Sequence, residues 1–98
     1  MIRYHADGPT DDPVAAAAHF HRDHLADVEA ALRDGQSVAI VFPPANHEHR
    51  EWREAAAAML ARKYTPLRCN AVAGADVEPL LTYLESAEAI TGQYLVAG

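Results

Sequence analysis

Histidine is the residue type whose number and spacing in this sequence most suggest chemistry. Six of the 98 residues are histidines, and five of them fall into two short clusters, at positions 19 to 24 and 47 to 49. A neutral imidazole ligates transition metals, and an imidazole also exchanges protons near neutral pH. Both clusters are therefore candidate sites.

The first cluster is a candidate metal site. His21 and His24 are three residues apart and can share one face of a helix, whereas His19 and His21 point in different directions. Two imidazoles at this spacing hold a metal when a third ligand joins them, and Asp23 or Asp27 is nearby in the sequence. The alternative is that these are polar surface residues, with His21 flanking an apolar stripe. We favour the surface interpretation and predict no metal.

The second cluster is a candidate catalytic or binding site because of its position. The residues Asn46, His47, Glu48, His49 and Arg50 open a predicted helix directly after a predicted strand. In open parallel sheets, ligands bind at the carboxyl ends of the strands. His47, His49 and Arg50 are therefore the candidate catalytic residues. In the alternative interpretation, Asn46 caps the helix, Glu48 complements the helix dipole and both imidazoles are solvated.

Two further residues follow the next predicted strand, at the same edge of the sheet. Gly74 and Asp76, together with Asn46, are the candidates for the border of a ligand-binding or cofactor-binding cleft. The simpler interpretation is that Gly74 makes a turn and Asp76 caps a helix. We therefore predict no bound cofactor.

The elements that must position these residues alternate between strand and helix. Residues 37–42, SVAIVF, form a continuous β-branched run, which is typical of a strand covered on both faces. Predicted strands cover residues 1–4, 37–42, 67–72 and 93–96, and predicted helices cover 13–34, 46–64 and a segment that begins between 74 and 76. This alternation predicts a small three-layer α/β/α sandwich with a parallel, Rossmann-like sheet of about four strands. Residues 1–98 are predicted to form a single domain, with 1–12 as an N-terminal strand and loop.

Apolar residues at three- and four-residue steps identify the inward faces of the two long predicted helices. The positions expected inside are Val14, Ala17, Ala18, Leu25, Val28 and Leu32 on the first helix, and on the second Trp52, Ala56, Met59, Leu60 and Lys63 share one side.

Composition excludes several classes of function. The net charge of −6 argues against nucleic-acid binding, which needs a basic face. No apolar run is long enough to span a membrane, and the start of the chain has no signal-peptide pattern, so we expect a cytoplasmic protein. The single cysteine, Cys69, lies in an apolar stretch and is predicted to be a buried hydrophobic residue.

Two segments near the end of the chain carry a family resemblance. Residues 67–74, LRCNAVAG, resemble the IRVNAVAPG segment of short-chain dehydrogenases/reductases, and residues 84–98, LESAEAITGQYLVAG, are similar to LASDEASYITGQVLVVDGG of that family. Residues 31–44, ALRDGQSVAIVFPP, resemble the segment that this family writes as MRARGGGSIVNISS. The resemblance spans residues 20–98 and corresponds to the C-terminal portion of the family, which implies a degenerate Rossmann-like fold.

The same resemblance implies a catalytic apparatus that this sequence lacks. The family holds a dinucleotide with a glycine-rich turn, and no Gly-x-x-x-Gly-x-Gly or Gly-x-Gly-x-x-Gly occurs here. The family transfers a proton through a Tyr-x-x-x-Lys pair, and none of the four tyrosines is followed four residues later by lysine. Counted back from Asn70, the tyrosine and lysine positions of that pair fall near Pro44 and Glu48. The position of the family's catalytic serine falls near Pro43 or Pro44. Hydride transfer is therefore not expected.

The elements that this sequence retains suggest a different role. In the resembled family, the two long helices beside the central strands form an interface between subunits, and the last strand and its helix form another. We therefore expect a non-catalytic assembly or accessory subunit, either a homo-oligomer or a partner of a larger enzyme. The alternative is a small cofactor-free enzyme or ligand binder that uses the histidines at the C-terminal edge of the sheet.

Overall fold

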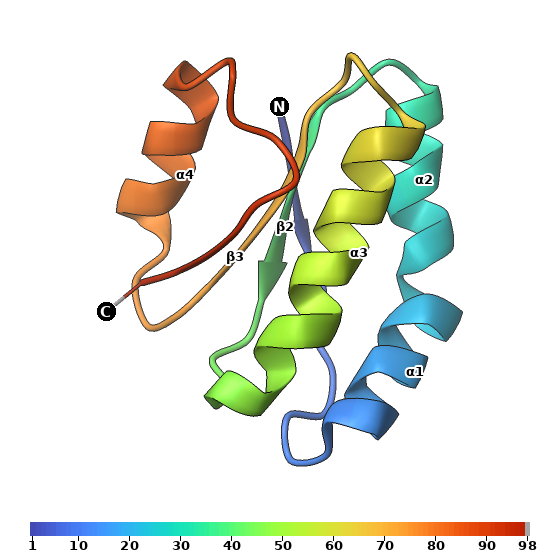
Figure 1. Cartoon of the computed structure of the whole chain (residues 1–98), viewed down its shortest axis with the longest axis vertical. Coiled ribbons are helices and arrows are strands. Elements are labelled where there is room, and N and C mark those ends of the chain that lie inside the picture. The colour runs from blue at the N-terminus through green and yellow to red at the C-terminus, as the bar shows by residue number, and fades with distance from the viewer. Residues whose placement is uncertain (98) are drawn as a thin grey trace.

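The computed structural model describes residues 1–97 and contains a single sheet of four parallel strands. The strands are β1 (Ile2–His5), β2 (Val38–Phe42), β3 (Cys69–Ala73) and β4 (Tyr94–Val96), adjacent in that order. The helices are α1 (Pro13–Asp23), α2 (Leu25–Arg33), α3 (Arg50–Lys63) and α4 (Glu78–Ser86), with a short 3₁₀ helix, η1 (His47–His49). One face of the sheet is covered by α1, α2 and α3 and the other by α4 (Figure 1). The predicted three-layer, Rossmann-like fold class is confirmed.

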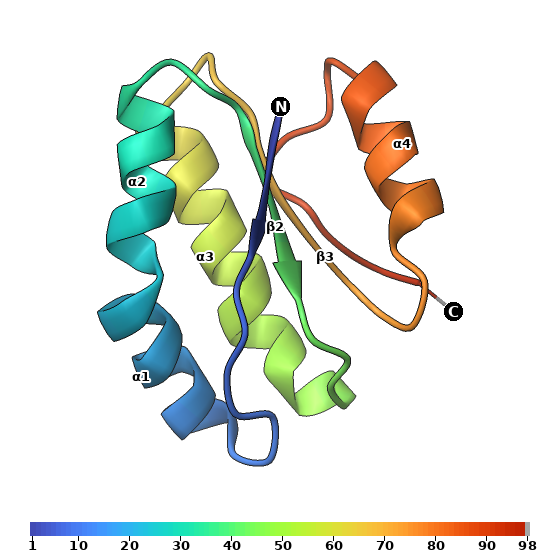
Figure 2. The same cartoon turned by 180° about the vertical axis from the view of Figure 1, so that it is seen from behind.

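The two central strands are buried along their whole length. All five residues of β2 and all five of β3 are buried, and Val38 pairs with Cys69 at the start of the shared register. Helices cover both faces of these strands, so neither face needs polar side chains, which explains the uninterrupted apolar run of β2. The view from behind shows β1 beside β2 at one edge of the sheet (Figure 2).

The prediction of one helix over residues 13–34 is wrong, because the helix breaks at His24. This residue has φ −120° and ψ −31° and separates α1 from α2. The imidazole of His24 lies 2.7 Å from the carbonyl oxygen of Asp7 and 2.8 Å from the hydroxyl of Tyr4. We attribute the break to these two contacts, since both partners lie outside the helix and hold His24 toward the sheet.

The inward face of the first helical segment is also different from the predicted one. Val14 is 80% exposed and Ala18 is exposed, whereas Ala16 and Phe20 are buried. The ring of Phe20 packs between other aromatic rings, and a large aromatic side chain gains more from burial than valine does. On α3, Met59 is 54% exposed and Lys63 is exposed, so these two predicted inward positions face outward.

The remaining predicted elements are close to those observed. The third predicted helix begins at Glu78, a few residues later than expected, and the last strand begins at Tyr94. Among residues 1–97, we find no helix with both the length and the apolar character that crossing a bilayer requires.

Cys69 is buried at the start of β3, as predicted, and burial raises the pKa of its thiol from 9.0 to about 12. Because the thiolate is the reactive form, we expect Cys69 to react with iodoacetamide at least about 100-fold more slowly in the folded protein than in urea. Mass spectrometry of timed samples measures both rates. Rapid labelling of the folded protein would contradict the burial of this thiol.

Candidate functional site

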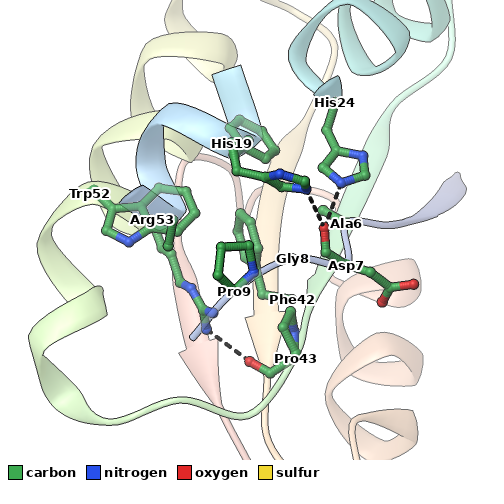
Figure 3. Close-up of a pocket in the computed structure, with 12 residues that line it drawn as sticks. Ala6, Asp7, Gly8, Pro9, His19, His24, Phe42, Pro43, Trp52 and Arg53 are labelled. Carbon is green, nitrogen blue, oxygen red and sulfur yellow. Dashed lines mark hydrogen bonds between the residues drawn. The ribbon is translucent and has the colours of Figure 1, made fainter. Parts of the chain in front are cut away.

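The residues with the most unusual environment lie beyond the carboxyl ends of β1 and β2. The loop Asp7–Thr10 follows β1, and its residues Asp7, Gly8 and Pro9 line a cavity of about 10 Å³ together with His19 of α1 (Figure 3). The loop is tightly placed, because a Cβ at Gly8 would lie 2.6 Å from Cδ2 of His19. The cavity wall opposite the loop includes Phe42 of β2 and Arg53 of α3.

Arg53 is the largest fully buried side chain of the protein, with 1% exposure. Its Nη1 donates hydrogen bonds of 3.0 Å to the carbonyl oxygen of Pro43 and of 3.0 Å to the hydroxyl of Tyr94. Its guanidinium carbon lies 4.6 Å from the centre of the Phe42 ring and 5.5 Å from that of Trp52, in cation–π contact. The Nε atom has no partner, and within residues 1–97 no carboxylate lies within 4.0 Å.

His49 is also fully buried, which contradicts the interpretation of both second-cluster imidazoles as solvated. Its Nε2 lies 2.9 Å from the carbonyl oxygen of Thr10, which can only accept, so Nε2 carries the proton. Its Nδ1 accepts a 3.2 Å hydrogen bond from Nε1 of Trp52. Both ring nitrogens therefore make hydrogen bonds within the chain, and His49 anchors the loop through Thr10.

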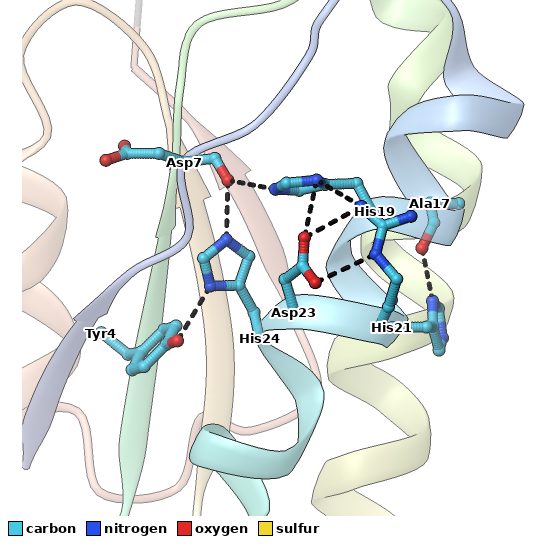
Figure 4. A network of polar contacts seen from close by, with 8 residues as sticks. Tyr4, Asp7, Ala17, His19, His21, Asp23 and His24 are labelled. Carbon is cyan, nitrogen blue, oxygen red and sulfur yellow. Dashed lines mark hydrogen bonds and ion pairs between the residues drawn. The ribbon is translucent and has the colours of Figure 1, made fainter.

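The loop is held at its other end by His19 and His24 (Figure 4). Their Nε2 atoms lie 3.1 Å and 2.7 Å from the same acceptor, the carbonyl oxygen of Asp7. On its other side, His24 contacts the hydroxyl of Tyr4, which also donates to Asp27 at 3.3 Å. Desolvation, followed by the negative charge of Asp27, raises the pKa of Tyr4, so this phenol stays protonated.

The candidate metal ligands of the first cluster do not converge. His21 is exposed and its Nδ1 lies 2.7 Å from the carbonyl oxygen of Ala17, while His24 points away from it toward the sheet (Figure 4). Asp23 pairs instead with Arg22, whose hydrogen bond is the main cause that lowers the pKa of this carboxyl. Within residues 1–97, no three potential metal-ligating side chains of His, Cys, Asp or Glu gather at one point.

The other candidates of the second cluster lie on an open surface. His47 and Arg50 are exposed and, with Asn46 and Tyr94, they line a hollow of about 150 Å³. The guanidinium carbon of Arg50 lies 5.5 Å from the centre of the Tyr94 ring. Oδ1 of Asn46 accepts a 2.9 Å hydrogen bond from the backbone N–H of Glu48, so Asn46 is the cap that its position suggested.

The cleft-edge candidates after β3 have backbone roles in the structure. Gly74 has φ +132°, and a Cβ there would lie 2.7 Å from the carbonyl oxygen of Ala97, so only glycine fits. Asp76 accepts a 3.3 Å hydrogen bond from the backbone N–H of Glu78 at the start of α4. Gly74 therefore makes the turn that was the simpler interpretation, whereas the N-cap residue of α4 is Val77 and Asp76 lies one residue before it.

Sequence reasoning missed Arg53. A charged residue in an alanine-rich helix is normally predicted to face solvent, and no neighbouring residue in the sequence indicates that Arg53 is buried. The available signal was its position one helical turn after His49, since residues four apart share a face. His49 contacts Thr10 of the loop Asp7–Thr10 and Arg53 lines the cavity beside that loop, and the loop comes from a distant part of the chain.

The parallel sheet, the three layers and the strand order define a Rossmann-like α/β protein. A model of the SDR-like family, described as short chain dehydrogenase-like protein, matches residues 4–97, and this chain belongs to that family. The resemblance inferred from residues 67–74 and 84–98 is thereby confirmed. No curated protein and no solved structure matches the chain.

One spacing across the junction of η1 and α3 is the same as that of the family's proton-transfer pair. His49 and Arg53 are four residues apart, which is also the interval of the Tyr-x-x-x-Lys pair, and they lie five positions after the count that led to Pro44 and Glu48. Their hydrogen bonds to Thr10, Trp52, Pro43 and Tyr94 are all made within the chain.

Proposed function

We propose that this chain is a non-catalytic, short-chain-dehydrogenase-like assembly or accessory subunit that associates through one face of α3. This surface, here called the α3 outer face, consists of Glu51, Ala55, Ala58, Met59 and Arg62. The partner is a second copy of the chain or a larger enzyme subunit with a matching helix.

The shape of the α3 outer face supports association. Its residues recur at three- and four-residue steps on the side of α3 that faces away from the sheet, and Met59 at its centre is 54% exposed. Open grooves of about 550 Å³ and about 400 Å³ flank the alanines. A ridge of small side chains between two grooves suits close packing of another helix.

The charges of this surface carry the proposal, because they make the face complementary to itself. Glu51 and Arg62 lie at opposite ends of the stripe, and neither forms an ion pair with another residue in the range 1–97. A two-fold axis midway between Ala55 and Ala58 places Glu51 of one copy opposite Arg62 of the other. Such isologous pairing is the rule in symmetric dimers.

The non-catalytic part of the proposal has separate support. The sequence contains no glycine-rich dinucleotide turn and no Tyr-x-x-x-Lys pair. The two side chains with the corresponding spacing, His49 and Arg53, are buried and bonded to the chain's own atoms. Of the two histidines that a small cofactor-free enzyme would use at this edge, His49 is engaged in holding the loop Asp7–Thr10, whereas His47 is exposed.

The test is a charge exchange on the α3 outer face, read by native mass spectrometry and sedimentation. We expect the unmodified chain to form a dimer. Glu51→Arg and Arg62→Glu, each alone, place like charges together at two symmetric points and weaken the dimer by about tenfold or more. The double variant restores opposite charges and recovers much of the affinity.

A matched control is Glu88→Arg, which makes the same change of net charge as Glu51→Arg at an exposed position two residues after the end of α4. This variant is expected to dimerise like the unmodified chain. A chain that stays monomeric at every concentration and forms no complex with a dehydrogenase-like subunit would overturn the proposal. So would single charge variants that associate normally.

A further inference from the structure

The buried guanidinium of Arg53 is a positive charge without a matching negative one. Its exposure is 1%, its two hydrogen bonds go to uncharged oxygens, and no carboxylate in the described range 1–97 reaches it. A buried charge is costly unless it is paired, so a folded chain rarely retains one without a purpose. The faces of Phe42 and Trp52 compensate only part of that cost.

The edge of the guanidinium that contains Nε makes no hydrogen bond from Nε, and this edge is suited to a carboxylate. Both hydrogen bonds leave from Nη1, and Nε is left without a partner. The planar fork of arginine matches a carboxylate by two parallel N–H donors, and Nε belongs to one such pair. The unused donor therefore has the geometry of half of a bidentate carboxylate site.

The place of Arg53 in the fold is also that of a ligand site. It lines the small cavity that lies outside the carboxyl ends of β1 and β2, the edge where open parallel sheets bind ligands. We propose that Arg53 binds a small carboxylate anion in this cavity, under the loop Asp7–Thr10. The site lies below the loop and does not involve the α3 outer face, so it is independent of the proposed association.

The size of the cavity requires the loop to move when a carboxylate binds. The volume of about 10 Å³ holds about one water molecule, which is less than a carboxylate occupies. The loop is the wall of the cavity that can move, since Asp7, Gly8 and Pro9 are exposed. Its anchors are hydrogen bonds from imidazoles to its carbonyl oxygens, and none of these bonds involves a strand residue.

The protein carries a reporter for this site, because Trp52 is its only tryptophan and lies 5.5 Å from the Arg53 guanidinium. The experiment is a titration with sodium formate at neutral pH, with sodium chloride added to keep the ionic strength constant, read by tryptophan fluorescence. We expect a saturable change with formate. Arg53→Lys retains the charge but not the fork, and should weaken formate binding by about tenfold.

Arg53→Met removes the charge and should abolish the saturable response, while Arg33→Met, at an exposed arginine of α2, should leave it unchanged. If Arg53→Met does not fold, the comparison of Arg53→Lys with Arg33→Met decides. A response to chloride equal to that of formate, or no saturable response to formate, would overturn the proposal. Repeating the titration on Glu51→Arg separates this result from any effect of dimerisation.

Discussion

Replacing Phe20 with alanine is expected to destabilise the folded protein by about 3–5 kcal/mol. The side chain of Phe20 is 1% exposed, and its ring centre lies 5.4 Å from that of Phe42 and 5.8 Å from that of Trp52. Its removal leaves a cavity where α1 meets β2 and α3. Since domains of this size have a total stability of about 5–15 kcal/mol, urea unfolding followed by circular dichroism should show a large shift of the midpoint.

The control for this prediction is Val14→Ala on the same helix. Val14 is 80% exposed, so its truncation should change the free energy of unfolding by no more than about 0.5 kcal/mol. Similar midpoints for both variants would mean that α1 packs on the sheet through another face than the one described.

The second large effect is expected from Asn70→Asp. Asn70 in β3 is fully buried, its Nδ2 donates to the carbonyl oxygen of Ile90 at 3.0 Å, and its Oδ1 accepts from the backbone N–H of Gln93 at 3.0 Å. Aspartate keeps the acceptor but places a buried carboxylate oxygen against the carbonyl of Ile90. We expect a loss of about 3 kcal/mol at neutral pH.

The pH dependence of this variant gives a second readout. Burial disfavours the ionised carboxyl, so its pKa is raised in the folded state, and the protonated acid can donate to Ile90 again. The loss of stability relative to the unmodified chain should therefore shrink as the pH falls. A difference in stability that is independent of pH would contradict a buried carboxylate at this position.

Asn46→Asp is the matched control, because it is the same substitution at a position where the side chain acts only as a hydrogen-bond acceptor. Oδ1 of Asn46 receives the backbone N–H of Glu48, and aspartate caps a helix equally well. Stability should stay within about 0.5 kcal/mol of the unmodified chain. The pair of variants separates the loss of the Asn70 donor from a general effect of added charge.

The features that the sequence determined by itself are those encoded over short stretches of chain. The apolar run 37–42 identified the central strand, Asn46 identified a cap, and the alternation of elements identified the parallel sheet. The segments 67–74 and 84–98 identified the family. In each case the residues that carry the signal are neighbours in the chain, so local propensity and periodicity are sufficient.

The tertiary structure alone decided which side chains of the candidate site are buried. The helix breaks at His24 because the ring of His24 contacts the carbonyl oxygen of Asp7 and the hydroxyl of Tyr4. His49 can be buried because Thr10 and Trp52 provide hydrogen-bond partners for both of its ring nitrogens. Arg53 is enclosed by a loop more than 40 residues away in sequence. Helical periodicity places these polar side chains on a surface, and only the folding of a distant loop over them turns that surface into an interior.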